Sequence, residues 1–418
     1  MSLPHLVFLV NRHNTNSIAA LAGVIETTPD LADLEVDFLW ENAHASDRLL
    51  RLANEDRQPV CLILSFVTAH RLRVRALLQE LSFEASVRQK ITIVAGGAHP
   101  SGDPEDTLRL GVDVVACGEG EQIFTDLLLR LREGAPILEI PGTVIRWDGA
   151  VRYGPKARLV NLEQYPPFSV KYERFAPLEI TRGCPFGCQF CQTPFLLGGK
   201  VRHRSVASLS EHVTQAMRHG YSYLRFITPN ALSYGSPDGR SVNLGAVEEL
   251  LTAMNRLMPR DRIYFGSFPS EVRPESISPE AITLIRRYAA NDNLVFGAQT
   301  GSPRLLASLR RGHTVEDIYR AAEITVAGGL RPIIDFVFGL PEETEDDVEM
   351  TMKVISDLAE MGGIIHSHSF MPLPGTPLET APPGRISSKF HALLDRLASQ
   401  GKHFGQWRRQ EELSQNNC

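Results

Sequence analysis

The sequence is poor in cysteine and lacks any long hydrophobic run: only six cysteines occur in 418 residues. So few thiols in so long a chain argue against a disulfide framework and are typical of a reducing compartment, where thiols stay free for metal binding or catalysis. No apolar run has the length of a bilayer-spanning helix, so a membrane partner is not expected. The apolar stretch at residues 6–10 is too short for a signal peptide and is typical of a first strand. We therefore expect a cytoplasmic protein.

An excess of basic charge is also missing, because the formal net charge is -6 and the pI is near 6.1. A dedicated nucleic-acid-binding protein normally has a basic face, so a nucleic-acid partner is not expected. The composition, with 43% hydrophobic and 22% charged residues, is that of a globular protein. A chain of 418 residues exceeds what one hydrophobic core usually supports, which predicts two domains.

Residues 1–135 alternate strand-like apolar runs with helical patterns, as a parallel α/β sheet does. These repeated units predict a Rossmann-like, doubly wound α/β domain whose ligand site lies outside the carboxyl ends of the strands. The predicted strands are 5–11, 34–40, 60–66, 91–97 and 113–118.

Residues 136–176 break this pattern, and we expect them to form a hairpin and a linker. The hairpin is predicted at 143–154, with Asp148 and Gly149 in its turn. The following segment, 161–177, contains three prolines and is typical of a connection between domains.

A second alternating series occupies residues 177–375. Its six strand-helix units are fewer than the eight of a closed barrel and predict a partial (β/α)6 barrel with an open side. We expect residues 376–418 to form a C-terminal helix and tail. The predicted barrel strands are 178–182, 223–228, 262–268, 293–299, 331–339 and 364–370.

Half of the cysteines lie in one segment, TRGCPFGCQFC at 181–191, directly after the first predicted barrel strand. Barrel enzymes keep their chemistry at this end of the strands, so Cys184, Cys188 and Cys191 are candidate metal ligands. Zinc is one alternative, but structural zinc takes four protein ligands and no fourth residue has a matching spacing. A [4Fe-4S] cluster held by three thiolates explains the missing ligand better, because one iron then stays open for a substrate or cofactor.

This Cys-x3-Cys-x2-Cys segment, with Phe190 before its third cysteine, resembles the signature of the radical S-adenosylmethionine (SAM) superfamily. The resemblance implies that the open iron binds the amino and carboxylate groups of SAM. It also implies that an electron from the cluster cleaves SAM to a 5′-deoxyadenosyl radical.

The resemblance implies SAM contacts in the segments that follow the later barrel strands. Segment 226–235 lacks the Gly-Gly-Glu motif usual there, and backbone near two of its residues is expected to replace it. Segments 268–275, 296–314 and 335–344 resemble the third-, fourth- and fifth-strand segments of the family. The SAM-binding residues expected from these matches are Phe190, Thr228, Asn230, Glu271, Gln299, Ser302, Arg311 and Asp335.

Particular roles follow from the same matches. Gln299 and Ser302 are expected to point into the site, and Arg311 to pair with the SAM carboxylate through its planar fork. Asp335 is expected to contact the SAM ribose, and Glu271 the SAM amine or a neighbouring arginine.

His366 and His368 alternate on the sixth predicted strand, so their side chains share one face. Either is a candidate catalytic base or substrate contact near the barrel axis. Packing at the rim of the barrel is the alternative.

Three loops of the first domain, 65–70, 95–108 and 116–124, resemble the strand-end loops of cobalamin-binding domains in this superfamily. Glycine lets the backbone approach a large ligand closely. The chain has no Asp-x-His-x-x-Gly motif, so the lower ligand of cobalt stays open. The expected cobalamin-binding residues are Ser65, Gly96, Gly97, His99, Gly118 and Glu119.

The resemblance therefore implies a cobalamin-dependent radical SAM methyltransferase that acts on an unactivated carbon of a small molecule or peptide, with flavodoxin or ferredoxin as electron donor. A cobalamin-dependent cyclase or rearrangement enzyme is a close variant. A corrinoid-free, methylthiotransferase-like enzyme is a second hypothesis, although only Cys61 and Cys117 precede the three-cysteine segment. A non-catalytic iron-sulfur protein is the third.

Overall fold

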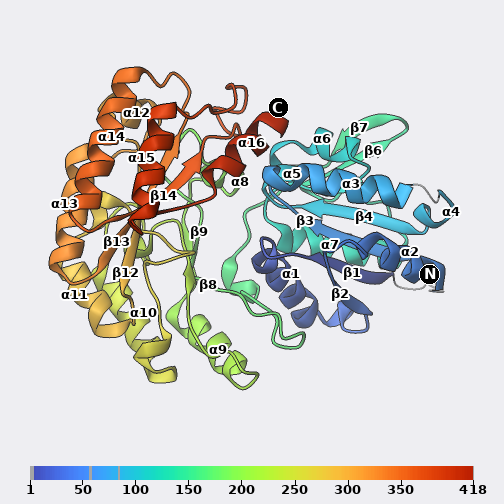
Figure 1. Ribbon diagram of the computed structural model, residues 1–418. Helices are drawn as coiled ribbons and strands as arrows, with labels where there is room; N and C mark the ends of the chain where they lie inside the picture. Colours follow the sequence, from blue (N-terminus) through green and yellow to red (C-terminus); the bar gives the residue numbers. More distant parts are fainter. Residues whose placement is uncertain (1–3, 56–58, 83–84, 418) are drawn as a thin grey trace. The chain divides into compact units, whose positions relative to one another are not determined.

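A computed structural model describes residues 4–55, 59–82 and 85–417 of the chain. The chain divides into two units, residues 1–176 and residues 177–418. We call them the N-terminal unit and the C-terminal unit (Figure 1).

The N-terminal unit contains a seven-stranded sheet in the order β2-β1-β3-β4-β5-β6-β7. The first five strands in this order are parallel, and β6 and β7 are antiparallel additions at one edge. This is a doubly wound, Rossmann-like arrangement, in which the strand order reverses between β1 and β3. The strands are β1 His5–Val10, β2 Val36–Trp40, β3 Val60–Ser65, β4 Ile91–Gly96, β5 Val114–Ala116, β6 Thr143–Trp147 and β7 Ala150–Tyr153.

Alternate residues of each parallel strand serve two separate cores, because the sheet is covered on both faces (Figure 1). From β1, Leu6 and Phe8 pack towards α1 and α7, whereas Val7 and Leu9 pack towards α2 and α3. The helices are α1 Thr15–Thr27, α2 Ala45–Glu55, α3 Arg71–Ser82, α4 Ala85–Arg88, α5 Ala98–Gly102, α6 Pro104–Arg109 and α7 Gly120–Glu133.

The hairpin expected in the linker belongs instead to the sheet of the N-terminal unit. Strand β6 pairs with β5, with Val144 opposite Val115. Val144 contributes to one core and Ile145 to the other, so burial of β6 explains why the hairpin joins the sheet. The predicted turn is present, with φ of 48° at Asp148 and 75° at Gly149.

The C-terminal unit is a partial barrel of parallel segments. β8 pairs with β11, and β12-β13-β14-β15 form a four-stranded sheet. Between them, Tyr264 N donates to Leu224 O, just before β11, and Val295 N of β12 donates to Gly266 O, each at 2.9 Å. β9 and β10 form a separate antiparallel pair. The strands are β8 Leu178–Glu179, β9 Thr181–Arg182, β10 Arg202–His203, β11 Phe226–Ile227, β12 Asn293–Gln299, β13 Arg331–Phe338, β14 Ile364–Ser369 and β15 His403–Phe404.

The barrel differs from the sequence prediction at its third segment and at its end. Residues 262–268 form no regular strand: Ile263 makes a single bridge with Leu224. Gly266, with φ of 71°, interrupts the extended backbone there. The expected tail instead adds β15, which pairs with β14.

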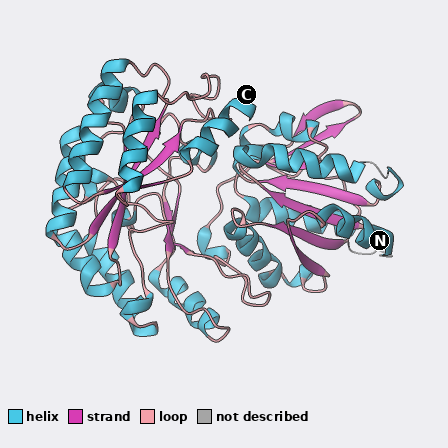
Figure 2. Cartoon of the chain, viewed as in Figure 1, coloured by secondary structure: helices cyan, strands magenta, loops and turns pink. Residues whose placement is uncertain are grey.

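Helices cover the strands of the C-terminal unit on one side (Figure 2). Two of them, α13 and α14, begin with complete capping boxes, Thr314 with Asp317 and Thr344 with Asp347. The helices are α8 Gln192–Leu196, α9 Val206–Met217, α10 Leu244–Leu257, α11 Pro279–Tyr288, α12 Pro303–Ser308, α13 Val315–Ala327, α14 Glu345–Glu360, α15 Ser388–Ser399 and α16 Trp407–Asn417.

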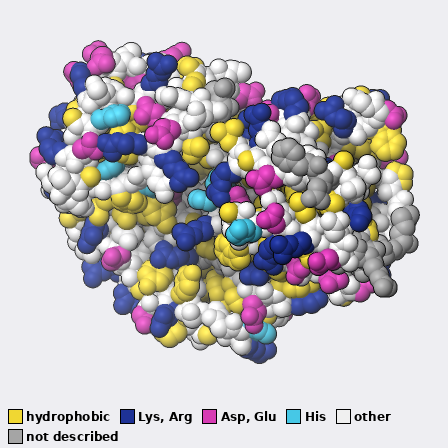
Figure 3. Space-filling view, turned by 45° about the vertical axis from the view of Figure 1, so that its right-hand side comes forward, with side chains coloured by type: hydrophobic (Ala, Val, Ile, Leu, Met, Phe, Trp, Pro, Cys, Tyr) yellow, Lys and Arg dark blue, Asp and Glu magenta, His cyan; other side chains and the backbone are white. Residues whose placement is uncertain are grey.

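None of the helices among the described residues is long and apolar enough to cross a bilayer. Lys and Arg side chains are interspersed with Asp and Glu over the face shown in Figure 3, in keeping with the small net charge.

A buried ion pair connects the loops at the carboxyl ends of β3 and β4. Asp106 accepts hydrogen bonds from Arg71 Nη2 at 2.7 Å, and His99 Nε2 lies 3.1 Å from the same carboxylate. Burial alone would raise the pKa of Asp106, but the hydrogen bonds from Arg71 and His99 outweigh it and lower that pKa. The charged carboxylate is therefore the form that stabilises these loops.

We expect Asp106→Asn to destabilise this region at pH 7 by about 2 kcal/mol, because it leaves Arg71 and His99 without their anionic partner. Hydrogen exchange of amides in residues 91–110 should become roughly 30-fold faster. Because the pKa is lowered in the folded protein, the contribution is present above about pH 4 and is lost as the pH falls further.

The control is Asp126→Asn, since Asp126 is a partly exposed residue whose carboxylate accepts a hydrogen bond from Gln122. Unchanged exchange in Asp106→Asn at pH 7 would contradict the assignment.

Candidate active site

The three-cysteine segment forms a loop between β9 and α8 in the C-terminal unit. Backbone hydrogen bonds fix its path: Cys184 N donates to Gly198 O at 3.1 Å and Gln189 N to Leu309 O at 3.1 Å. Cys191 N donates to Cys188 O at 3.1 Å, which closes a turn inside the loop. The loop is therefore held to the barrel by its backbone, independently of its thiols.

The thiols of Cys184, Cys188 and Cys191 lie near enough to interact electrostatically. Burial raises the pKa of the Cys184 and Cys191 thiols. The three thiols do not all lie within 4.8 Å of one another, because the group of ligand atoms that meets this limit among the described residues contains no cysteine. The thiols are therefore too far apart to coordinate one small ion. This wider spacing suits a cluster of several metal atoms.

Arg311 connects this loop to β12. Its Nη1 donates to Cys188 Sγ at 3.3 Å and its Nη2 to Gly297 O at 2.9 Å. Its Nε is buried and has no hydrogen-bond partner. A cationic N–H that is buried and unpartnered is costly unless an anionic ligand receives it.

Two further arginines, Arg240 and Arg273, hold the same loop through Phe186. The guanidinium carbon of Arg273 lies 3.6 Å from the centre of the Phe186 ring, and that of Arg240 lies 4.9 Å from it. Arg273 also donates to the carbonyl of Arg311 and to Glu275, and Arg240 donates to the carbonyl of Pro185. Arg273 is a site residue that the sequence did not predict, although it stands two residues after Glu271, on the same side of an extended segment.

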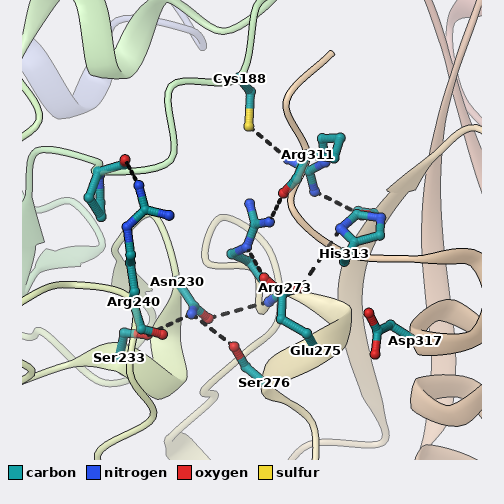
Figure 4. Close-up of polar contacts among 12 residues, drawn as sticks. Cys188, Asn230, Ser233, Arg240, Arg273, Glu275, Ser276, Arg311, His313 and Asp317 are labelled. Carbon is teal, nitrogen blue, oxygen red and sulfur yellow. Dashed lines mark hydrogen bonds and ion pairs between the residues drawn. The ribbon is translucent and has the colours of Figure 1, made fainter. Parts of the chain in front are cut away.

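The two residues expected to replace the missing Gly-Gly-Glu motif are buried. Asn230 donates to Ser233 Oγ at 2.7 Å and Ser276 Oγ at 3.1 Å, and it accepts from the backbone N of Arg273 at 3.3 Å. Thr228 Oγ1 donates to Asn230 O at 3.3 Å. The Asn230 side chain thus holds the segment that carries Arg273 (Figure 4), whereas Thr228 bonds within its own loop.

Gln299 and Arg311 lie together where β12 ends. Gln299 has a φ of 72°, which is unusual for a residue other than glycine, and the pairing of β12 with β13 is irregular there. A Cβ on Gly297 would lie 2.1 Å from Gln299 Nε2 and 3.2 Å from Arg311 Nη2. Glycine at position 297 is therefore what leaves room for both polar side chains.

Ser302 does not have the role expected of it. Its hydroxyl caps α12 by accepting from Leu305 N at 3.3 Å, and it donates to the buried carboxylate of Asp347 on α14. The structure thus corrects the expectation that Ser302 points into the site: Ser302 joins two helices. Phe190 lies beside an apolar cluster made by Leu305, Leu309, Leu340 and Phe370.

A second polar group lies on β13, β14 and the 271–275 segment. His366 Nδ1 is 2.8 Å from Asp335 Oδ1, and the side chain of Glu271 is hydrogen-bonded to Asp335. Burial, then the neighbouring Asp335, raises the pKa of Glu271 to about 8, and burial raises the pKa of Asp335 to about 7. The two carboxyl groups therefore share a proton near neutral pH.

His368 stands next to His366 on the same face of β14, with ring centres 4.2 Å apart. Burial, then His366, lowers the pKa of His368 to about 4, so this imidazole is neutral at pH 7. Gln410 Nε2 lies 3.4 Å from His368 Nδ1, and Phe404 stacks on His366 at 4.4 Å. Sequence analysis missed Gln410 and Phe404, because only the pairing of β15 with β14 brings the C-terminal segment here.

In the N-terminal unit, the strand-end loops meet at the carboxyl ends of β1, β3, β4 and β5. Ser65 ends β3, and Gly96 ends β4. Gly97 has a φ of 100°, and a Cβ there would lie 2.9 Å from Phe66 O. Gly118 also has a φ of 100° but has nothing within 4 Å of a Cβ, which leaves its surroundings open to a ligand.

His99 and Glu119 are buried and have partners inside the N-terminal unit. His99 Nδ1 lies 3.2 Å from Thr68 Oγ1, and its other ring nitrogen faces Asp106. Glu119 Oε2 accepts from Val160 N at 2.8 Å. Contrary to the expected cobalamin contacts, both polar side chains bind neighbouring loops, so they position the strand-end loops.

Two family models match separate parts of the chain. The B12 binding domain matches residues 10–128, and the radical SAM superfamily matches residues 178–355. The first match lies within the N-terminal unit and the second within the C-terminal unit.

Two curated relatives are similar over much of the chain. An uncharacterized methyltransferase of Pyrococcus horikoshii, PH0819, is 25% identical over 287 residues, which cover 65% of this chain and 59% of the relative. A tRNA-2-methylthio-N(6)-dimethylallyladenosine synthase of Methylobacillus flagellatus is 28% identical over 347 residues, which cover 77% of this chain and 73% of the relative. The chain thus spans about six tenths of the length of PH0819.

One solved structure extends the similarity to the fold of both units. The radical S-adenosylmethionine methyltransferase TsrM from Kitasatospora setae, with cobalamin and a [4Fe-4S] cluster bound, matches with a TM-score of 0.68 and 18% identity. The match covers 90% of this chain and 74% of TsrM.

We expect Ser302→Ala to lower the free energy of unfolding of the C-terminal unit by about 2 kcal/mol, since it removes a helix cap and a hydrogen bond to a buried carboxylate. Urea unfolding followed by the fluorescence of Trp407 measures this. Trp407 is 2% exposed, whereas Trp40 and Trp147 of the N-terminal unit are 49% and 55% exposed and report little.

Ser308→Ala is the matched control, because Ser308 is an exposed residue of the same helix. Equal stabilities of the two variants would show that the Ser302 hydroxyl is not structural and would restore it as a ligand contact.

Proposed function

We propose that the chain is a cobalamin-dependent methyltransferase, because residues 178–355 match the radical SAM superfamily and residues 10–128 match the B12 binding domain. Its substrate would be a small molecule or peptide with an unactivated carbon. The observation that carries the proposal is the cysteine loop: three thiols lie in one loop, and the Arg311 guanidinium is hydrogen-bonded to one of them.

The residues of the loop fit a [4Fe-4S] cluster and SAM. Cys184, Cys188 and Cys191 would hold three irons. The hydrogen bond from Arg311 Nη1 to Cys188 Sγ is the kind of contact that adjusts the reduction potential of such clusters. The free Nε of Arg311 would receive the carboxylate of SAM.

The N-terminal unit fits a corrinoid at the carboxyl ends of its strands, the usual ligand site of a doubly wound sheet. The close backbone approach at Gly97 and the open surroundings of Gly118 support this placement. His99 and Glu119 would act by holding the loops, because their polar atoms already have partners.

When bound, the cluster supplies the electron that cleaves SAM, and the corrinoid supplies the carrier of the methyl group. The polypeptide contributes positions and surroundings. Arg311 would orient SAM, and the apolar cluster beside Phe190 would exclude water from it. The proton shared by Glu271 and Asp335 would keep two carboxyl groups together without two negative charges.

A corrinoid-free, methylthiotransferase-like enzyme is the alternative, favoured by the similarity to the Methylobacillus protein. The cysteines of the N-terminal unit argue against it. Cys61 is fully buried within β3, and Cys117 donates weakly to Pro100 O at 3.8 Å. Two such thiols would not hold a second cluster of the three-cysteine kind. A cobalamin-dependent cyclase or rearrangement enzyme would use the same cofactors, and each version needs an electron donor such as flavodoxin or ferredoxin.

We expect anaerobically reconstituted protein to contain about four irons per chain, to bind hydroxocobalamin, and to form 5′-deoxyadenosine from SAM under reduction. Cys184→Ala, Cys188→Ala and Cys191→Ala should each lose the cluster absorption and this activity. Iron analysis, optical spectra and chromatography of the nucleoside measure these properties.

Cys117→Ala is the control and should keep iron and activity. Formation of 5′-deoxyadenosine without a bound corrinoid would favour the methylthiotransferase-like alternative. The absence of both 5′-deoxyadenosine and bound corrinoid, or zinc in place of iron at the loop, would overturn the proposal.

We further expect Gly297→Ala to weaken SAM binding at least tenfold, because the added methyl group displaces the ends of Gln299 and Arg311. Iron content should stay unchanged, since the three cysteines remain and backbone hydrogen bonds fix the path of their loop. Equilibrium dialysis with labelled SAM on the reconstituted protein measures the affinity.

Gly245→Ala is the control, because the nearest atom to a Cβ there, in ordinary contact, is Asn243 Oδ1 at 3.7 Å. Equal SAM affinity of Gly297→Ala and wild type would remove Gln299 and Arg311 from the SAM site.

A further inference from the structure

We propose that Asp335, His366 and His368 together bind one divalent transition-metal ion, separate from the cysteine loop. One ligand atom from each residue lies within 4.8 Å of those of the other two. In a zinc site with bonds of about 2.1 Å, two ligand atoms are at most about 4.2 Å apart, so small side-chain movements complete the site. The inference does not rest on the proposed methyl transfer.

The strand register places these ligands on one surface. Asp335 on β13 lies opposite His366 on β14, and His368 follows two residues later on the same face. The neighbouring Phe338 faces the other way and contacts Phe390 of α15 at 4.4 Å. The three ligands therefore lie on the face of the sheet opposite α15, which is the interior face of the barrel.

The neighbours of the two imidazoles fix the rings. His366 is stacked on Phe404 at 4.4 Å and meets the edge of Phe268 at 5.1 Å. Gln410 lies beside Nδ1 of His368, which leaves Nε2 as its ligand atom. Metal-bound histidines are usually oriented in this way by a contact at the other nitrogen or at the ring.

The charges around the site allow a cation. Glu271 is hydrogen-bonded to Asp335, and the one negative charge that the two carboxyl groups share offsets the positive charge of Arg311 nearby. Two imidazoles and a carboxylate are a ligand set for Zn²⁺ or Fe²⁺. They leave coordination positions open, so the ion would hold a nitrogen, oxygen or sulfur atom of the substrate inside the barrel.

The same carboxylate was expected to contact the SAM ribose, and the two roles compete. Asp335 already bonds His366 and Glu271, so a ribose would have to displace one of them. Metal binding replaces only the hydrogen bond between Asp335 and His366 with bonds from both residues to the ion. The effect of SAM on metal binding therefore distinguishes the two roles.

The experiment adds Zn²⁺ to the anaerobic, tag-free full chain with its cluster in place, followed by desalting and metal analysis. We expect one zinc per chain in addition to the iron. X-ray absorption at the zinc edge should show nitrogen and oxygen neighbours at about 2.0–2.1 Å and no sulfur at about 2.3 Å. Because X-ray absorption at the zinc edge observes only the bound zinc, the measurement uses the wild-type chain and does not depend on enzymatic activity.

The variants His366→Gln and His368→Gln should each weaken zinc binding at least tenfold. The matched control is His403→Gln: His403 is a partly buried histidine of the adjoining β15, paired opposite Ile365 and bonded to Ser367 Oγ at 3.0 Å. It should bind zinc as wild type does. Zinc should also be retained when SAM is added at saturation.

Four results would overturn the proposal: no zinc retained by the wild-type chain, sulfur neighbours around the zinc, zinc binding as tight as wild type in His366→Gln and His368→Gln, or release of zinc by SAM. The last result would return Asp335 to the SAM site. Loss of 5′-deoxyadenosine formation without any change in zinc binding would instead concern the proposed function alone.

Discussion

The hydrogen bonds of Arg311 hold the candidate active site together. This one buried guanidinium joins the cysteine loop, through Cys188, to the end of β12, through Gly297. Its carbonyl accepts from Arg273, which in turn lies on the Phe186 ring of the loop. A buried charge with these partners cannot be removed without leaving several polar groups unsatisfied, so the loop, the third segment and β12 keep one arrangement.

The interior of the barrel thus has two regions of different chemistry. Around the cysteine loop the polar groups are guanidinium ions, which suit the carboxylate of SAM and the sulfur ligands of a cluster. On β13 and β14 they are carboxyl and imidazole groups, which suit a cation. Arg311 acts on both regions, because its charge also reaches Asp335.

Sequence reasoning succeeded where the signal was a pattern. Alternating apolar runs predicted all five parallel strands of the first sheet and most barrel strands, because burial on two faces imposes that pattern. It failed for single polar side chains: Ser302 and Glu119 each found a partner on a distant element, which no local pattern reveals. It also missed Arg273, whose stacking on Phe186 depends on two loops meeting.

The sequence by itself determined the α/β class, the three-cysteine loop and its position after the first barrel strand, because these depend on local periodicity and spacing. The tertiary structure alone decided which polar groups share the barrel interior. Residues far apart in the chain, such as Cys188 and Arg311 or His368 and Gln410, become neighbours only when the strands take their order. Hydrogen bonds and ligand geometry act over about 3 Å, so the residues that form a site are settled by the packing of the elements that carry them.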